Sequence, residues 1–126
     1  MSKILIVDDS ELMRKRLALI LEQENHEIVG QAKDGLEAIK LFQEKTPDLI
    51  TMDITMPVMD GIEAIKEIME IDPHAKIVVC SAMGQQKIIV QAIKEGAKDF
   101  IVKPFHEGHV IETIHNVLYP YEGTPR

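Results

Sequence analysis

The sequence predicts an α/β fold: a doubly wound sheet of five parallel strands with helices on both faces. Three observations support this prediction. Short runs rich in Ile, Val and Leu alternate with stretches of helical periodicity, the loops between them are short, and the chain has 126 residues, which fits one domain. Strands that alternate with helices pair in parallel, because each helix carries the chain back to the start of the next strand.

Five runs have the length and composition of buried strands, and each is bounded by charged or turn-forming residues. The expected strands are Lys3–Val7, Glu27–Gln31, Asp48–Met52, Lys76–Cys80 and Asp99–Val102. Right-handed crossovers leave few ways to arrange them. Of the two common doubly wound orders, the flavodoxin-like order 2-1-3-4-5 suits a chain of five strands.

The stretches between the strands carry apolar residues at helical spacing, which predicts one buried face for each helix. These faces comprise Met13, Leu17, Ile20 and Leu21; Ile62, Ile65, Ile68 and Met69; Ile88, Ile89, Ala92 and Ile93; and Val110, Ile111, Ile114, Val117 and Leu118. Asp34 and Asp60 each precede a glutamate by three residues, so both are predicted helix N-caps. Gly96 follows a helical stretch, where a residue with positive φ is favoured.

Composition and charge disfavour several classes of partner. The net charge of −7 opposes binding to nucleic acid or to anionic membranes, because phosphates repel such a surface. No apolar run is long enough to cross a bilayer, and the apolar start ends in two acids, unlike a signal peptide. Cys80 is the only cysteine, so we expect a cytoplasmic protein without an internal disulfide. We expect one domain over residues 1–119 and a tail over 120–126.

Ionisable or hydroxyl side chains follow four of the five expected strands. Asp8 and Asp9 follow the first strand, Asp53 the third, Ser81 the fourth and Lys103 the fifth. The carboxyl ends of parallel strands meet at one edge of a sheet, and ligands of doubly wound sheets bind there. We therefore expect three carboxylates, one hydroxyl and one ammonium to converge.

Three clustered carboxylates need a positive partner, since two of them about 4 Å apart repel by roughly 4 kcal/mol at an effective dielectric of 20. Mg²⁺ prefers oxygen ligands and keeps waters that phosphate oxygens can replace. Metal, lysine and hydroxyl together form the set that stabilises a phosphoryl group in transfer. Asp53, on a central strand, is the expected acceptor. Asp8 and Asp9 would hold the metal, and Ser81 and Lys103 would contact phosphoryl oxygens.

Four segments carry a more specific pattern. They are Ile-Leu-Ile-Val-Asp-Asp-Ser at 4–10, Asp-Leu-Ile-Thr-Met-Asp-Ile-Thr-Met-Pro-Val-Met-Asp-Gly at 48–61, Cys-Ser-Ala-Met-Gly at 80–84 and Gly-Ala-Lys-Asp-Phe-Ile-Val-Lys-Pro-Phe at 96–105. In order and spacing they resemble the receiver domains of response regulators, over nearly the whole chain. Thr-Met-Asp-Ile-Thr-Met-Pro and Ser-Ala-Met-Gly-Gln-Gln resemble most the stand-alone chemotaxis regulators of that family.

The resemblance implies a two-component phosphoacceptor switch rather than a conventional enzyme, catalysing only its own phosphorylation and dephosphorylation. A histidine kinase would phosphorylate Asp53 in the presence of Mg²⁺, for which Mn²⁺ could substitute. Asp9 and Asp53 would ligate the metal directly, together with the backbone carbonyl of Thr55, and Asp8 would act through water.

The resemblance also implies how the signal leaves the site. Ser81 would be the switch hydroxyl and Phe100 the switch aromatic, and the Lys103–Pro104 peptide would be cis. The fourth helix, fifth strand and fifth helix of a monomer would dock on a flagellar motor switch protein or another protein target. The alternative is a phosphorelay intermediate that passes its phosphate to a histidine phosphotransfer protein.

Two other classes share parts of this pattern. An FMN carrier of this fold would want a loop rich in glycine and hydroxyls after the first strand, where Asp8 and Asp9 would repel the FMN phosphate. An aspartate-based phosphatase carries a second acid two residues after its nucleophile, where this chain has Thr55. Both features favour the phosphoacceptor interpretation.

Overall fold

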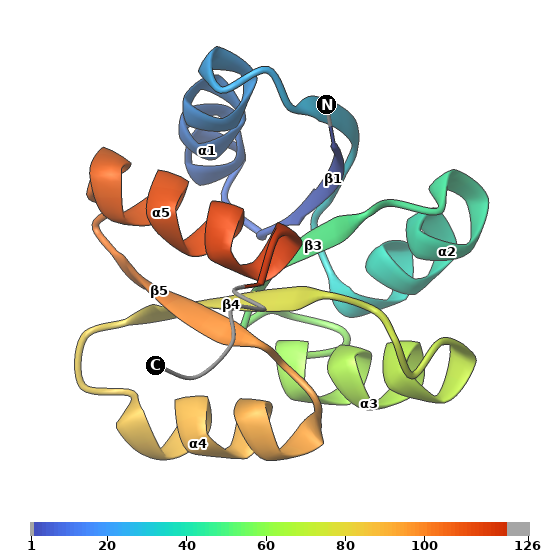
Figure 1. Cartoon of the computed structure of the whole chain (residues 1–126). Coiled ribbons are helices and arrows are strands. Elements are labelled where there is room, and N and C mark those ends of the chain that lie inside the picture. Colours follow the sequence, from blue (N-terminus) through green and yellow to red (C-terminus); the bar gives the residue numbers. More distant parts are fainter. Residues whose placement is uncertain (1, 121–126) are drawn as a thin grey trace, which may run out of the picture.

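The computed structural model describes residues 2–120 as a five-stranded parallel sheet in the order β2-β1-β3-β4-β5 (Figure 1). The predicted fold class and strand order are therefore confirmed. The strands are β1 (Lys3–Val7), β2 (Glu27–Ala32), β3 (Leu49–Asp53), β4 (Ile77–Ala82) and β5 (Asp99–Lys103). The helices are α1 (Glu11–Gln23), α2 (Gly35–Lys45), α3 (Gly61–Ile71), α4 (Gln86–Glu95) and α5 (Glu107–Leu118). Of the predicted tail, 120–126, all but Pro120 lies outside the described residues.

Four of the five strands extend further at their carboxyl ends than the sequence predicts. The ladder pairs Asp53 with Cys80, Ser81 with Val102 and Ala82 with Lys103. Parallel pairing thus continues through polar residues. The sequence prediction, which was based on apolar runs, had placed these residues just after the strands. As a result, the pleat of the sheet fixes the directions of the Asp53, Ser81 and Lys103 side chains.

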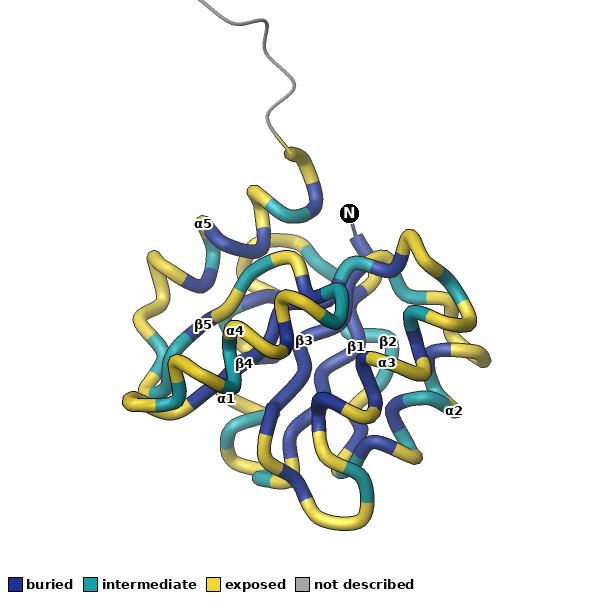
Figure 2. Tube along the Cα trace, turned by 90° about the horizontal axis from the view of Figure 1, so that it is seen from below, coloured by how far each residue is buried: buried dark blue, intermediate teal, exposed yellow. Residues whose placement is uncertain are grey.

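Two layers of helices cover the sheet (Figure 1). Helices α1 and α5 pack on one face around Leu21, Ile101 and Ile114, while α2, α3 and α4 pack on the other around Phe42 and Ile65. Figure 2 shows β1, β3 and β4 buried along most of their length, the edge strands β2 and β5 mostly half-buried, and the helices exposed on their outer sides. Within residues 2–120, no helix is long and apolar enough to span a membrane.

Local signals place the helix ends at the edge of the sheet where the acids lie. Asp34 accepts a hydrogen bond from the amide of Glu37, and Asp60 accepts one from the amide of Glu63, so both predicted caps are confirmed. Helix α3 starts so close to β3 that a Cβ on Gly61 would lie 2.3 Å from the carbonyl oxygen of Asp53. Glycine at this position is what lets α3 begin directly beside the acidic residues.

Candidate functional site at the carboxyl end of the sheet

Three carboxylates meet where β1 and β3 end. Asp8 and Asp9 follow β1, Asp53 is the last residue of β3, and a ligand oxygen of each lies within 4.8 Å of the others. Within residues 2–120, no other group of three such side chains meets the same distance limit. Asp8 and Asp53 are buried, whereas Asp9 is exposed. The cluster is therefore open to solvent on the Asp9 side, where a hydrated cation could enter.

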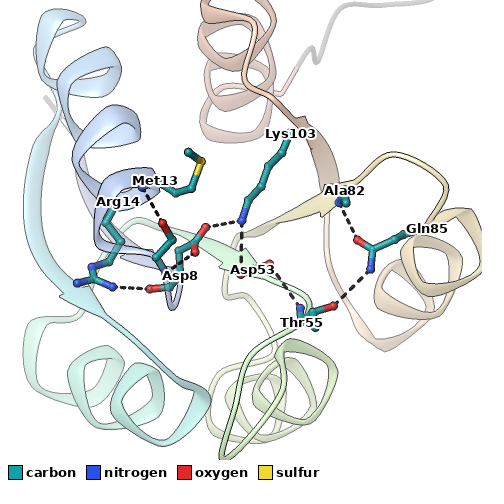
Figure 3. A network of polar contacts seen from close by, with 9 residues as sticks. Asp8, Met13, Arg14, Asp53, Thr55, Ala82, Gln85 and Lys103 are labelled. Carbon is teal, nitrogen blue, oxygen red and sulfur yellow. Dashed lines mark hydrogen bonds and ion pairs between the residues drawn. The ribbon is translucent and has the colours of Figure 1, made fainter.

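Lys103, the last residue of β5, supplies the positive charge nearest to these acids (Figure 3). Its Nζ lies 2.6 Å from Asp8 Oδ2 and 3.5 Å from Asp53 Oδ2. Burial opposes the charged form of Lys103, but the hydrogen bond to Asp8 and the charge of Asp53 outweigh it and raise the lysine pKa. The ammonium thus stays charged and, in this structure, pairs mainly with Asp8.

Asp53 is the most perturbed carboxyl of the cluster. Burial, and then the charge of Asp8, raise its pKa to about 7, although Lys103 and the Thr55 amide favour the ionised form. A single lysine therefore does not compensate the crowded carboxylates. This excess of negative charge fits the site for a divalent cation, which would keep Asp53 ionised and nucleophilic at neutral pH.

The segment between β1 and α1 holds Asp8 in place. The side chain of Asp8 accepts a hydrogen bond from the amide of Ser10 at 2.9 Å, and its carbonyl accepts one from Arg14 at 2.6 Å. Ser10 in turn caps α1 by accepting from the amide of Met13. Our sequence interpretation missed Ser10, although a serine directly before a helical stretch is a recognisable N-cap signal.

Ser81 and Phe100 lie on the two strands beyond Asp53. The Ser81 hydroxyl is buried within β4 and has no hydrogen-bond partner among the described residues. A buried hydroxyl without a partner is energetically costly, and it leaves Ser81 able to donate to a group that arrives at Asp53. Phe100 on β5 is 38% exposed rather than part of the core. The peptide bond between Lys103 and Pro104 is cis.

Gln85 is a residue of this site that the sequence interpretation missed. Its Oε1 accepts a hydrogen bond from the Ala82 amide at 2.7 Å, and its Nε2 donates to Thr55 Oγ1 at 3.3 Å (Figure 3). The Thr55 amide donates to Asp53 Oδ1 at 3.4 Å. No helix-capping signal could have found these bonds, because Ala82 is the last residue of β4 and Gln85 itself directly precedes α4.

Comparison with known proteins decides the family. The model of the response regulator receiver domain matches residues 4–115, which include every site residue described above. The chain belongs to the response regulator receiver family. Asp8, Asp9 and Asp53 therefore form the acidic pocket of a receiver domain.

Individual receivers are similar over nearly their whole length. The chemotaxis protein CheY of Thermotoga maritima is 56% identical over 91% of this chain and 96% of its own. CheY of Bacillus subtilis is 53% identical over 92% of this chain and 97% of its own. CheY in a crystal structure of the CheX-CheY-BeF3-Mg²⁺ complex from Borrelia burgdorferi is 38% identical, with a TM-score of 0.89, over 92% of this chain and 88% of that one.

Proposed function

We propose that this receiver is a two-component switch in which a histidine kinase transfers a phosphoryl group to Asp53. The observation that carries the proposal is the convergence of Asp8, Asp9, Asp53 and Lys103 from β1, β3 and β5. Asp8 and Asp53 are both buried and near Lys103, but only Asp53 lies on β3, the middle strand of the sheet. It is therefore the acceptor in this proposal.

The donor set fits Mg²⁺, and Mn²⁺ as a substitute, because it consists of carboxylate oxygens with one open side. Asp9, Asp53 and the backbone carbonyl of Thr55 would hold the ion directly, and Asp8 would hold it through water. When bound, the ion neutralises negative charge on the carboxylates and on the transferring phosphoryl group.

In the transfer itself, a carboxylate oxygen of Asp53 attacks the phosphorus of a phosphohistidine. The new O–P bond forms as the N–P bond breaks, and the ring takes up a proton from solvent, so that it leaves as neutral imidazole. Lys103 exchanges part of its contact with Asp8 for a phosphoryl oxygen, and the Ser81 hydroxyl donates a hydrogen bond to another. Water later attacks phosphorus, which releases inorganic phosphate and restores the Asp53 carboxylate.

The same hydrogen bond links the chemistry to the surface. Ser81 moves toward the phosphoryl group and vacates space beside β5, which the ring of Phe100 can enter from its half-exposed position. Phosphorylation then shifts the ratio of two Phe100 arrangements through its differential interaction with them. Ser81 and Phe100 are accordingly the switch residues.

The surface that changes would lie on α4, β5 and α5. Val90, Ile93 and Phe100 are exposed apolar residues on α4 and β5, and a cleft beside them is lined by Met83, Ile89 and Val102. Because relatives more than 50% identical are chemotaxis proteins, the partner we propose is a flagellar motor switch protein in the cytoplasm. A phosphorelay role, with transfer to a histidine phosphotransfer protein, is the alternative; neither role requires a nucleic-acid partner or a dimer.

The nucleophile is tested by labelling with acetyl phosphate and Mg²⁺. We expect one phosphoryl group per chain, none in Asp53→Asn, and an unchanged level in Asp60→Asn. The Asp60 control is matched because asparagine caps a helix as well as aspartate does. Labelling of Asp53→Asn at the parent level would refute the assignment.

The output is tested by binding to a motor-switch peptide with and without phosphorylation. Affinity that rises on phosphorylation supports the chemotaxis role. Unchanged affinity, together with rapid loss of the phosphoryl group to a histidine phosphotransfer protein, would replace that role with the relay role.

A further inference from the structure

One side-chain amide ties together the two loops that flank Asp53. Gln85, in the loop from β4 to α4, bonds back to the Ala82 amide at 2.7 Å and across to Thr55 Oγ1 at 3.3 Å, in the loop from β3 to α3. Thr55 continues the chain of contacts to Asp53. We call these two bonds of Gln85 the Gln85 bridge; Figure 3 shows it spanning from Ala82 to Thr55.

The position of Gln85 lets the bridge hold the β4–α4 loop in place. Gln85 directly precedes α4, but its side chain makes no capping bond to that helix. The rest of its loop is loosely held, since Met83 is largely exposed and Gly84 has φ +86° with open space around it. The bridge therefore contributes strongly to fixing the spacing of this loop relative to Thr55.

Ser81 connects the bridge to phosphorylation. It is covalently joined to Ala82, and while the bridge is formed its buried hydroxyl has no hydrogen-bond partner within residues 2–120. A backbone movement of Ser81 toward Asp53 carries the Ala82 amide with it. Such movement strains or breaks the bond to Gln85, and with it the contact to Thr55.

We propose that Gln85 is a positioning residue that stabilises the unphosphorylated arrangement of the β4–α4 loop and releases it when Ser81 engages the phosphoryl group. This inference rests on the proposed phosphorylation of Asp53. Gln85 does not touch the reacting atoms. Its two hydrogen bonds add to the free energy needed for Ser81 to reach the reacting atoms. When these bonds break, Gln85 frees the first turn of α4 to move.

Removing the bridge should therefore make phosphorylation easier. The loop would no longer lose hydrogen bonds on its way to the transition state. Because the bond to Thr55 is long and exposed, we count the loss as one net hydrogen bond, which corresponds to about a three- to tenfold change in rate. Gln85→Met keeps the length of the side chain but removes both bonds. Gln86→Met is the matched control, because the Gln86 side chain makes no hydrogen bond with the residues that the structure describes.

The experiment measures the initial rate of Asp53 phosphorylation by acetyl phosphate at saturating Mg²⁺, together with the amide NMR signal of Ala82. We expect about a three- to tenfold faster rate in Gln85→Met, a shifted Ala82 signal before phosphorylation, and parent behaviour in Gln86→Met. A rate in Gln85→Met equal to that of the control overturns the inference.

A double-mutant cycle with Thr55→Val tests the link across the site, since valine keeps the shape of threonine but lacks Oγ1. If Gln85 acts through Thr55, the two rate effects combine to less than their product; fully multiplicative effects contradict the link. A parent protein that is not phosphorylated on Asp53 overturns the proposed function and this inference together. Normal parent phosphorylation with no effect of Gln85→Met overturns this inference alone.

Discussion

Lys103 Nζ lies 2.6 Å from Asp8 Oδ2 but 3.5 Å from Asp53 Oδ2. Before phosphorylation, the lysine is thus bound more closely to a metal-site acid than to the acceptor. An arriving phosphoryl group has to draw the ammonium away from Asp8. The cation and Lys103 consequently both neutralise the negative charge of the buried carboxylates.

Lys103→Met should destabilise the metal-free protein, because it leaves the buried carboxylate of Asp8 without its partner. We expect the free energy of unfolding at pH 8 to fall by about 2 kcal/mol in urea denaturation. The control is Lys15→Met, which removes a pair with Glu11 whose side chains are 66% and 69% exposed, and should change it by less than about 0.5 kcal/mol. Equal effects of the two substitutions would contradict the structural role of Lys103.

Mg²⁺ should raise the melting temperature by binding the folded chain only. A concentration tenfold above the dissociation constant corresponds to about 1.4 kcal/mol of added stability. Asp9→Ala should weaken this shift strongly and should stabilise the metal-free protein by relieving repulsion. KCl at equal ionic strength controls for screening. A parent melting curve unmoved by millimolar Mg²⁺ would show that the cluster is not a magnesium site.

Stability should fall as pH rises toward neutrality when Mg²⁺ is chelated. The pKa of Asp53 is raised to about 7, compared with about 4 in the unfolded chain, so the folded state binds more protons between these values. The contribution of Asp53 to the free energy of unfolding is therefore lost between about pH 4 and pH 7, and it does not change further above pH 7. Asp53→Asn should exceed the parent in stability at pH 8 and approach it at pH 5. Urea denaturation at both pH values measures this, and a pH-independent difference would refute the raised pKa.

Val58, in the loop from β3 to α3, has φ +67°, and the Met59 amide donates to the Pro57 carbonyl across it. A β-branched residue is strained in this conformation, and Val58 is 76% exposed, so little packing is lost on its removal. Val58→Gly should raise the free energy of unfolding by about 0.5–1 kcal/mol. Val90→Gly, at a half-exposed position in α4, should lower the free energy of unfolding by a similar amount. Destabilisation at both positions would contradict the strain.

Phe100 should couple phosphorylation to partner binding by packing alone. We expect Phe100→Ala to be phosphorylated like the parent but to lose most of the gain in affinity for the motor-switch peptide. Phe100→Tyr keeps the ring and should retain the gain. Binding isotherms with and without acetyl phosphate measure both. Undiminished coupling in Phe100→Ala would mean that the signal leaves the site by another route.

Local sequence information determined much of the fold. Alternating apolar runs and helical spacing predicted the elements, and the known orders of doubly wound sheets then supplied the strand order. The spacing of Asp34 and Asp60 from their glutamates predicted two helix starts, because capping acts within a few residues. The same pattern placed Asp53 and Lys103 at one edge of the sheet, since parallel strands bring their carboxyl ends together. The sequence prediction ended β3, β4 and β5 too early, because strand pairing continues beyond the apolar residues.

Distances across the site depended on the tertiary structure. No spacing in the chain shows that Lys103 pairs with Asp8 more closely than with Asp53, or that Gln85 reaches Thr55 thirty residues away. Nor does it show that the Ser81 hydroxyl has no partner among the residues that the structure describes. The Lys103–Asp8 contact joins the ends of β5 and β1, and the Gln85–Thr55 contact joins the loops that lead into α4 and α3. The sequence therefore determined which groups gather at the edge, and packing between distant elements decided which of them touch.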